Sequence, residues 1–408
     1  MRILHLSTYD THGGASRAAY RIHKSLPGAG VESSMLVSRK FSSDDDVYVL
    51  KSQRSDISLK HRILSKIERL PVKFYNDSQN FSFPLFQEKL KNSVLVNSAD
   101  IVNLHWILYG FVRPDFLADL KKPIIWTLHD MWPFTGGCFY CGECSKYEDK
   151  CGNCPVLNSK HPRDLSYWGM KFKKRCWDNI DLTIVSPSRW LGQCAQKSTL
   201  FKDKNIRIIP YGIDTDVFKP IQKETAREIL KLPPDKKIIS LGAVVTTDKR
   251  KGYQYLTEAV RNNQCNFDVL TFGMQDKNNQ LNINTTVYDM GFVKNDTLLS
   301  LIYSASDLMV VPSVYENLPQ TAIEAMACAT PVVAFNATGL PDVVEHKKTG
   351  YLAQPYDAND LYNGIAWVLE DENRLNELSS NAVERVKTNF TYAVQSERYV
   401  ELYKEILS

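Results

Sequence analysis

Two carboxylates near the end of the chain are spaced so that they could contact one ligand. Glu316 precedes a predicted helix, and Glu324 lies within it, eight residues on. The N–H groups of a helix N-terminus favour phosphate, and in an open α/β sheet this terminus lies at the carboxyl ends of the strands. The stretch therefore predicts a phosphate-bearing ligand beside two carboxylates. The alternative is an ordinary β-α-β crossover with two solvated glutamates.

The elements that would position these carboxylates are a strand, a helix and a second strand. Residues 308–311 are apolar and rich in β-branched side chains, which predicts a buried strand that ends at Pro312. Asn317 is expected to cap the helix, with Pro319 in its first turn, where a missing N–H costs nothing. Residues 331–335 predict the second strand, whose initial proline ends the helix before it.

Five cysteines crowd into one segment of the first half and could bind a metal: Cys138, Cys141, Cys144, Cys151 and Cys154. Pairs at C-x2-C spacing suit tetrahedral zinc thiolate sites, and such a metal orders a loop too small to have its own core. By spacing alone, the pairs 141 with 144 and 151 with 154 are the plainest set, although five thiols for four positions leave the choice open. The predicted zinc is structural, since nothing indicates a vacant position or a general base. The alternatives are a disulfide-bearing loop and merely buried thiols.

Residues at the ends of predicted strands in the first half could line a second part of a site. The pair Gly13-Gly14 lies between a strand and a helix, where glycines let the backbone approach a ligand and the helix terminus adds positive potential. His105 and His129 end two further strands, at the edge where α/β sites collect. A lone histidine there is more often structural. The shared edge nevertheless favours a site at His129, with His105 as a weaker candidate.

A basic loop in the second half could neutralise the charge of a phosphate. Arg250 and Lys251 follow a strand predicted at 237–241. A run of Lys and Arg in a loop is otherwise usually a solvated turn.

The stretch around the two carboxylates resembles a known family. The spacing Glu-x7-Glu, in which the second glutamate begins E-A-M-A-C-x-x-P-V-V-A, is similar to the retaining glycosyltransferases of the GT-B fold, family GT4 type. Gly13-Gly14, the Thr-x-His-Asp that contains His129, and residues 211–214 are supporting matches. The resemblance covers nearly the whole chain. It implies an α/β protein with two Rossmann-like domains facing each other across a cleft.

The resemblance implies roles for the residues around the second-half helix. Glu316 would meet the donor sugar, and Glu324 would accept hydrogen bonds from the ribose hydroxyls. The backbone N–H groups of Asn317 and Leu318 would hold the sugar and the distal phosphate. His105 would lie on the acceptor side.

The remaining candidates would serve the same donor. By the resemblance, His129 would contact the donor hexose near its reacting carbon, and the Gly13-Gly14 loop would approach the pyrophosphate and the acceptor. Lys251 would neutralise the leaving diphosphate. The family usually has an arginine where this chain has Ala243, so Arg250 is expected to supply the missing charge. No cofactor is expected for catalysis, because cations and N–H groups would carry the developing charge.

The cysteine segment is also similar to an insert of a GT4 subgroup that reads W-P-F-T-G-G-C-x5-C-x6-C-G-x-C-P. This pattern would use Cys138, Cys144, Cys151 and Cys154 as ligands. It leaves Cys141 as the alternative ligand, and so differs from the set that spacing alone favours.

Three parts of the chain are predicted. Residues 1–210 would form an N-terminal, acceptor-side Rossmann-like domain that contains the cysteine-rich insert (136–156). Residues 211–390 would form a C-terminal Rossmann-like domain that binds the nucleotide-sugar. Residues 391–408 would form a helix that crosses back to the N-terminal domain.

The composition is that of an ordinary globular protein. The 408 residues are 43% hydrophobic and 24% charged, and the formal net charge of +4 gives no general argument for nucleic-acid binding. No signal peptide is expected at the start, and no apolar run approaches the ~20 residues of a membrane span. Nine cysteines, an odd number, fit a reducing cytoplasmic compartment better than a secreted disulfide framework.

One predicted helix could lie on a membrane. Residues 57–70 repeat apolar side chains at helical spacing, and Lys60, Arg62, Lys66 and Arg69 occupy much of the rest, with Lys73 beyond Pro71, which is expected to end the helix. A basic amphipathic helix can bind an anionic bilayer surface, which predicts peripheral association with the inner face of the cell membrane. A surface helix packed on the core is the equal alternative.

The sequence therefore predicts transfer of a hexose from a UDP- or GDP-sugar to an acceptor hydroxyl, with retention at the anomeric carbon. A lipid-linked glycan in bacterial polysaccharide biosynthesis is the expected acceptor. A GT-B sugar-nucleotide 2-epimerase is the alternative, although no acid/base carboxylate set for it is evident. A zinc-stabilised nucleic-acid-binding protein depends on the cysteines alone, and no nucleic-acid partner is expected.

Overall fold

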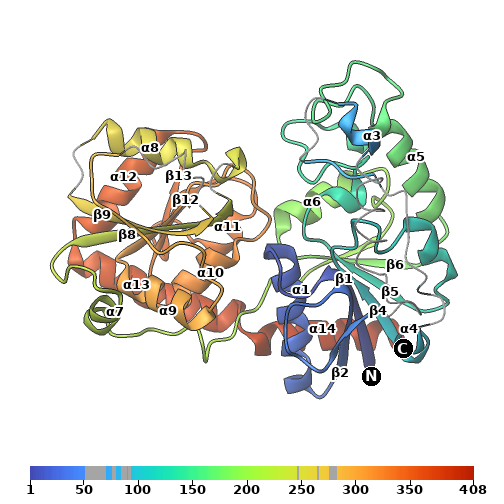
Figure 1. Ribbon diagram of the computed structural model, residues 1–408, viewed down its shortest axis with the longest axis horizontal. Coiled ribbons are helices and arrows are strands. Elements are labelled where there is room, and N and C mark those ends of the chain that lie inside the picture. Colours follow the sequence, from blue (N-terminus) through green and yellow to red (C-terminus); the bar gives the residue numbers. More distant parts are fainter. Residues whose placement is uncertain are drawn as a thin grey trace. The chain divides into compact units, whose positions relative to one another are not determined.

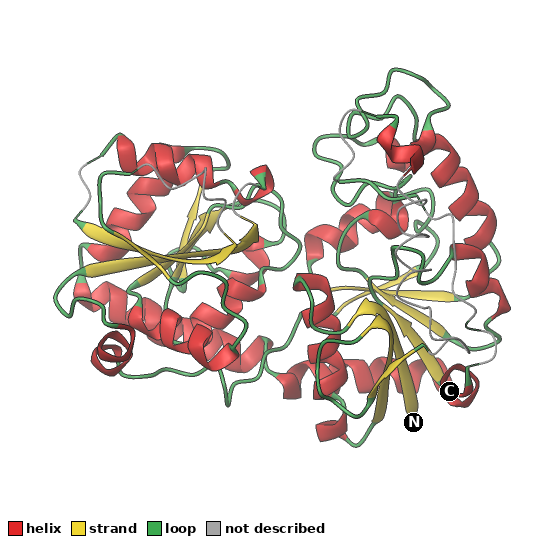
Figure 2. Ribbon diagram, viewed as in Figure 1, coloured by secondary structure: helices red, strands yellow, loops and turns green. Residues whose placement is uncertain are grey.

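The computed structural model describes residues 1–50, 70–75, 80–83, 90, 93–245, 248–263, 266–274 and 283–408. The chain divides into two compact units: unit 1 is Met1–Pro210 with Gln395–Ser408, and unit 2 is Tyr211–Val394. Each unit is a parallel β-sheet with helices on both faces (Figure 1, Figure 2). The predicted α/β class is confirmed.

Unit 1 contains a seven-stranded sheet in the order β3-β2-β1-β4-β5-β6-β7, and every strand pair is parallel. Its strands are β1 (Arg2–Tyr9), β2 (Glu32–Arg39), β3 (Val47–Val49), β4 (Ile101–Leu104), β5 (Ile124–Thr127), β6 (Leu182–Ser186) and β7 (Asn205–Ile208). The strand order reverses between β1 and β4. In such sheets, ligands bind at the carboxyl ends of the strands at this switch point.

Both faces of the unit 1 sheet are buried, which explains the nearly continuous apolar strands in the sequence. Ile3 and Ile101 belong to a core that also contains residues of α1 and α14. Leu4 and Val102, the next residue along each strand, belong to the larger core on the opposite face.

The helices of unit 1 are α1 (Gly14–Ser25), α3 (Leu70–Lys73), α4 (Val94–Ser98), α5 (Leu165–Trp177), α6 (Arg189–Lys197) and most of α14 (Tyr392–Leu407). From Gln395 onward, α14 packs on the unit 1 sheet, and the Tyr399 hydroxyl lies 3.0 Å from that of Thr127. The predicted helix end at Leu70 is wrong, because the described part of α3 continues to Lys73.

Unit 2 contains a six-stranded parallel sheet in the order β10-β9-β8-β11-β12-β13. The strands are β8 (Lys237–Val245), β9 (Phe267–Met274), β10 (Val287–Asp289), β11 (Leu308–Val311), β12 (Val332–Phe335) and β13 (Gly350–Ala353). Its helices are α7 (Lys223–Leu230), α8 (Tyr253–Arg261), α9 (Asp296–Ala305), α10 (Gln320–Ala327), α11 (Leu340–Val343), α12 (Ala358–Leu369) and α13 (Glu372–Asn389). Figure 1 shows α8 and α12 on one face of this sheet and α7 and α9 on the other. The switch point of unit 2 lies between β8 and β11.

Most of the predicted amphipathic helix, residues 57–69, lies outside the described residues, as do the basic side chains assigned to it except Lys73. Within the part of the chain that the structure describes, no helix combines the length and the apolar composition needed to span a bilayer.

Candidate active site

The predicted donor-binding stretch folds as β11, a loop and α10. Glu316 lies in the loop and Glu324 within the helix, as expected. The predicted helix start is wrong, because α10 begins at Gln320 with Pro319 as its N-cap residue and no side-chain capping bond, so Asn317 is not the cap. The physical reason is Pro319 itself: a proline disfavours helical geometry in the residue before it, which prevents a start at 317 or 318.

Glu316 is paired with the basic loop that follows β8. The Lys251 Nζ lies 2.5 Å from Glu316 Oε2. Arg250 is joined to the same loop, because its carbonyl accepts the Val314 N–H at 2.7 Å and its guanidinium donates to the Tyr315 carbonyl at 3.4 Å. Since β8 and β11 are neighbours, the basic loop and the carboxylate meet at the switch point of the sheet.

A third loop, between β12 and α11, holds Glu316 by its backbone. The Glu316 N–H donates to the Thr338 hydroxyl at 3.1 Å, and its carbonyl accepts the Gly339 N–H at 3.0 Å. A Cβ at Gly339 would lie 1.4 Å from the Asn317 carbonyl oxygen, so only glycine permits this approach. Nothing in the sequence indicated that Thr338 and Gly339 support Glu316.

Glu324 is buried, and a hydrogen bond from a neighbouring helix orients its carboxylate. The Tyr303 hydroxyl, on α9, donates to Glu324 Oε2 at 2.8 Å. Tyr303 is itself fully buried. No spacing rule connects these two residues, so the role of Tyr303 could not be predicted from the sequence.

In unit 1, the predicted site residues Gly13 and Gly14 lie at the start of α1. Gly13 is the N-cap residue of α1, and its φ of 89° lies in the left-handed region that favours glycine. Gly14 is the first helical residue of α1. The pair therefore lies at a helix N-terminus at the carboxyl end of β1.

His129 stands at the end of a hydrogen-bonded row of histidines. His105 Nδ1 lies 3.1 Å from His129 Nε2, and His105 Nε2 lies 2.9 Å from His5 Nδ1. Burial lowers the pKa of His129 to about 3 and holds the pKa of His5 and of His105 well below the usual value, so all three rings are neutral at pH 7. His105, expected on the acceptor side, is only 2% exposed and lies behind His129.

The comparisons with known proteins identify the family. The model described as Glycosyltransferase Family 4 matches residues 12–217, which is half of the chain, and the model described as Glycosyl transferases group 1 matches residues 222–385. The chain belongs to glycosyltransferase family 4. It is a glycosyltransferase, and its fold is GT-B, as predicted.

Individual relatives agree with this membership. The chain is 29% identical to an uncharacterised glycosyltransferase of Methanocaldococcus jannaschii over 330 residues, which are 78% of each protein. Sucrose-phosphate synthase from Thermosynechococcus elongatus has a TM-score of 0.70 at 22% identity and covers 99% of this chain and 98% of its own. Anabaena HepE in complex with UDP-glucose has a TM-score of 0.68 at 16% identity, with 99% and 100% covered. At these identities the solved structures show the shared fold.

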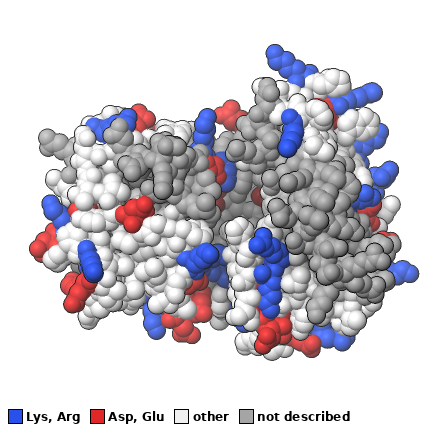
Figure 3. Space-filling view, viewed as in Figure 1, with Lys and Arg blue, Asp and Glu red and all other residues white. Residues whose placement is uncertain are grey.

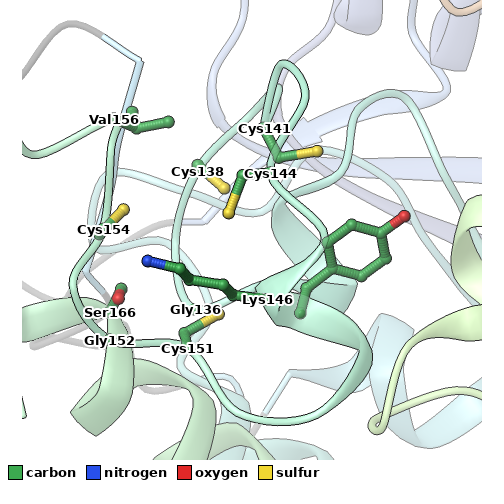
Figure 4. A pocket seen from close by; sticks show the side chains of 11 residues that line it. Gly136, Cys138, Cys141, Cys144, Lys146, Cys151, Gly152, Cys154, Val156 and Ser166 are labelled. Atoms are coloured by element: carbon green, nitrogen blue, oxygen red, sulfur yellow. The ribbon is translucent and has the colours of Figure 1, made fainter. Parts of the chain in front are cut away.

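The cysteine-rich segment (136–156), which the sequence predicts to be an insert, surrounds a small cavity of about 10 Å³ that all five cysteines line. Figure 4 shows the sulfurs of Cys138, Cys144, Cys151 and Cys154 pointing toward the cavity, whereas that of Cys141 points away. The Cys141 Sγ lies 3.5 Å from the Met131 sulfur instead. All five are free thiols. Among the described residues, no group of three or more His, Cys, Asp or Glu side chains is arranged to hold a metal ion as it stands.

Hydrogen bonds join this cysteine-rich segment and the residues before it to α5 and its N-cap. The Cys154 N–H donates to Asp164 at 2.8 Å, and Asp164 also caps the N-terminus of α5. The buried Lys173 donates to the carbonyls of Trp132 and Thr135, which lead into the insert. Burial lowers the pKa of Lys173 to about 7.

Proposed function

We propose that this glycosyltransferase moves a hexose from a UDP- or GDP-sugar to an acceptor hydroxyl with retention of the anomeric configuration. The observation that carries the proposal is the contact between Lys251 and Glu316 beside the N-terminus of α10, at the switch point of the unit 2 sheet. A cation, a carboxylate and a helix terminus together suit a ligand that bears both phosphate and hydroxyl groups. The complex of HepE with UDP-glucose supports a nucleotide-sugar as that ligand.

In this proposal, binding of the donor separates Lys251 from Glu316. Lys251 would exchange the Glu316 carboxylate for the donor diphosphate, with Arg250 adding charge beside it. Glu316 would then accept hydrogen bonds from the sugar hydroxyls. The N–H groups of Asn317 and Leu318 would hold the sugar and the distal phosphate.

The other proposed contacts fix the two ends of the donor. Glu324, already oriented by Tyr303, would accept hydrogen bonds from the ribose hydroxyls. His129 would contact the hexose near its reacting carbon as a neutral imidazole, and the Gly13-Gly14 terminus would approach the pyrophosphate. The departing phosphate oxygen would take the acceptor proton on the same face of the sugar, so that no side-chain base is required.

The proposed acceptor is a lipid-linked glycan at the inner face of a membrane. This part of the proposal depends on the basic pattern at 57–73, nearly all of which lies outside the described residues.

On the face drawn in Figure 3, the Lys and Arg side chains of the described residues lie among Asp and Glu, with no continuous basic patch. This mixture does not favour the alternative of a nucleic-acid-binding protein.

A donor panel tests the proposed reaction without knowledge of the acceptor. The purified protein is incubated with UDP-glucose, UDP-galactose, UDP-N-acetylglucosamine and GDP-mannose, and slow release of UDP or GDP is measured with and without chelator. We expect one donor to be hydrolysed in both conditions, and proton NMR to show the donor's anomer in the first sugar released. Release of the opposite anomer would overturn retention. A new sugar-nucleotide with no free nucleotide would identify an epimerase, and no turnover with or without glycan acceptors would reject the proposal.

We also propose that the insert holds one structural zinc through Cys138, Cys144, Cys151 and Cys154. The common direction of their sulfurs supports this set over one that includes Cys141 (Figure 4). Zinc–sulfur bonds of about 2.3 Å would draw the four thiolates together across the cavity.

Metal analysis of protein purified under reducing conditions is expected to find one zinc per chain. Cys144→Ser should lose the metal and destabilise the insert, because a structural zinc contributes directly to folding. Cys141→Ser, the matched control, should keep it. Metal-free wild-type protein, or loss of zinc from Cys141→Ser alone, would contradict this proposal.

A further inference from the structure

The histidine row, defined as His5, His105 and His129, crosses three neighbouring strands of unit 1. His5 lies in β1, His105 directly follows β4, and His129 follows β5 after one residue. These strands are adjacent in the sheet, so the three rings meet near its carboxyl edge. Exposure falls from 8% at His129 to 2% at His105 and 0% at His5, so the row leads from the carboxyl edge of the unit 1 sheet into the core.

The backbone fixes the middle ring of the row. The His105 N–H donates to the Leu6 carbonyl at 2.9 Å, and the His105 carbonyl accepts the indole N–H of Trp126 at 3.1 Å. Trp126 is fully buried. His105 therefore has little freedom to leave its two histidine partners.

Two neutral rings that share a hydrogen bond must also share one proton between the facing nitrogens. Because all three rings are neutral, only two arrangements satisfy both links. In the first, His129 Nε2 and His105 Nε2 donate inward, and His5 Nε2 carries a proton. In the second, His5 Nδ1 and His105 Nδ1 donate outward, and His129 carries its proton on Nδ1.

The inner end of the row selects between these arrangements. His5 Nε2 is buried, and no hydrogen-bond partner for it exists among the described residues. An orphaned buried N–H is rarer in proteins than an under-satisfied acceptor, which favours the second arrangement. We propose that His105 and His5 are positioning residues that hold the His129 proton on Nδ1 and fix the orientation of its ring.

This inference, which depends on the proposed contact of His129 with the donor, gives that contact a direction. With its proton on Nδ1, His129 would donate a hydrogen bond to a hydroxyl oxygen of the hexose. The opposite tautomer would offer only a lone pair at that atom. The row would therefore set the direction of the hydrogen bond between His129 and the donor hydroxyl, which leaves that hydroxyl's own proton for another acceptor.

Substitutions of His105 test the role with a matched control. His105→Leu removes both links, and we expect kcat for the active donor to fall by up to about 100-fold, as for other small losses of alignment, with KM changed less. His105→Asn places an amide N–H where Nδ1 lies and should recover most of the rate. His23→Leu is the control, because His23 is also buried in unit 1 and its ring lies edge-on to that of His5, with centroids 6.0 Å apart, but its Nδ1 bonds the Ser33 hydroxyl at 2.7 Å instead of a ring of the row. It should lower stability similarly while kcat stays within about twofold.

A spectroscopic measurement needs no activity. Nitrogen NMR of histidine-labelled protein, with His129→Gln to assign the signals, should show His129 protonated on Nδ1 in the wild type and a mixture of tautomers in His105→Leu. A His129 protonated on Nε2 would overturn the proposal, as would equal loss of kcat in His105→Leu and His23→Leu. If His129→Ala keeps full activity, the proposed donor contact fails. If His129→Ala is inactive but His105→Leu is not impaired, only the positioning role fails.

Discussion

Glu316→Gln is expected to lower kcat about 100- to 1,000-fold, the usual loss when one preorganised polar contact to the reacting group is removed. The substitution keeps the size of the side chain but removes the charge that binds Lys251. Binding of the free nucleotide should not weaken, because Lys251 no longer has to leave a carboxylate to reach the diphosphate. Calorimetry with UDP or GDP and steady-state kinetics with the donor found active measure the two effects separately.

Two further variants define the specificity of this result. Glu324→Ala should instead weaken the nucleotide itself, because the ribose hydroxyls would lose their buried partner. Glu345→Gln is the matched control, since Glu345 is also an ion-paired glutamate of unit 2, but it pairs with Lys348 and Arg385 instead of the basic loop. Equal losses of nucleotide affinity in the Glu316 and Glu324 variants would contradict the division of roles.

The fold class could be predicted because a buried parallel sheet has a strong local pattern. Strands such as β11 and β12 are short apolar runs bounded by prolines, and both lie where the sequence predicts them. Helix starts were less predictable. The α10 start failed because two local rules competed at one place: Asn317 is a good cap, but Pro319 prevents helical geometry in the residue before it.

The candidate site could be predicted where spacing along one element carries the information. Glu316 and Glu324 follow from the order of strand, loop and helix. The contacts of Glu316 with Lys251 and Thr338 could not be read from spacing, because they join loops that are 65 and 22 residues apart in the chain. The histidine row could not be read from spacing either, since His5 and His105 are 100 residues apart.

A buried ion pair in unit 2 shows the same dependence on distant residues. Asp307, between α9 and β11, accepts from the Arg227 guanidinium at 2.8 Å and from the Ile238 N–H at 2.8 Å. Asp307 and Arg227 are each only 4% exposed. Lys223 contacts the same carboxylate at 2.5 Å, but its side chain is 36% exposed.

Asp307→Ala is expected to destabilise unit 2 by about 3–5 kcal/mol, because it leaves the Arg227 charge buried without its counter-ion. Lys223→Met, the control at the same carboxylate, should cost no more than about 1 kcal/mol, because an exposed pair gains little over water. Hydrogen–deuterium exchange resolves the two units and should show lost protection in unit 2 only. A cost below about 1 kcal/mol for Asp307→Ala, or an equal cost for both variants, would contradict this account.

The double variant Asp307→Leu with Arg227→Met separates the charge from the hydrogen bonds. Replacing a buried pair by apolar side chains is often neutral, so most of the loss seen in Asp307→Ala should be recovered. Recovery should remain incomplete, because Arg227 also donates to the carbonyls of Ala305 at 3.0 Å and Pro234 at 2.6 Å. Those carbonyls and the Ile238 N–H would lose their partners, at about 1–3 kcal/mol for each group that stays buried. A double variant no more stable than Asp307→Ala would mean that these hydrogen bonds, rather than the unpaired charge, account for the loss.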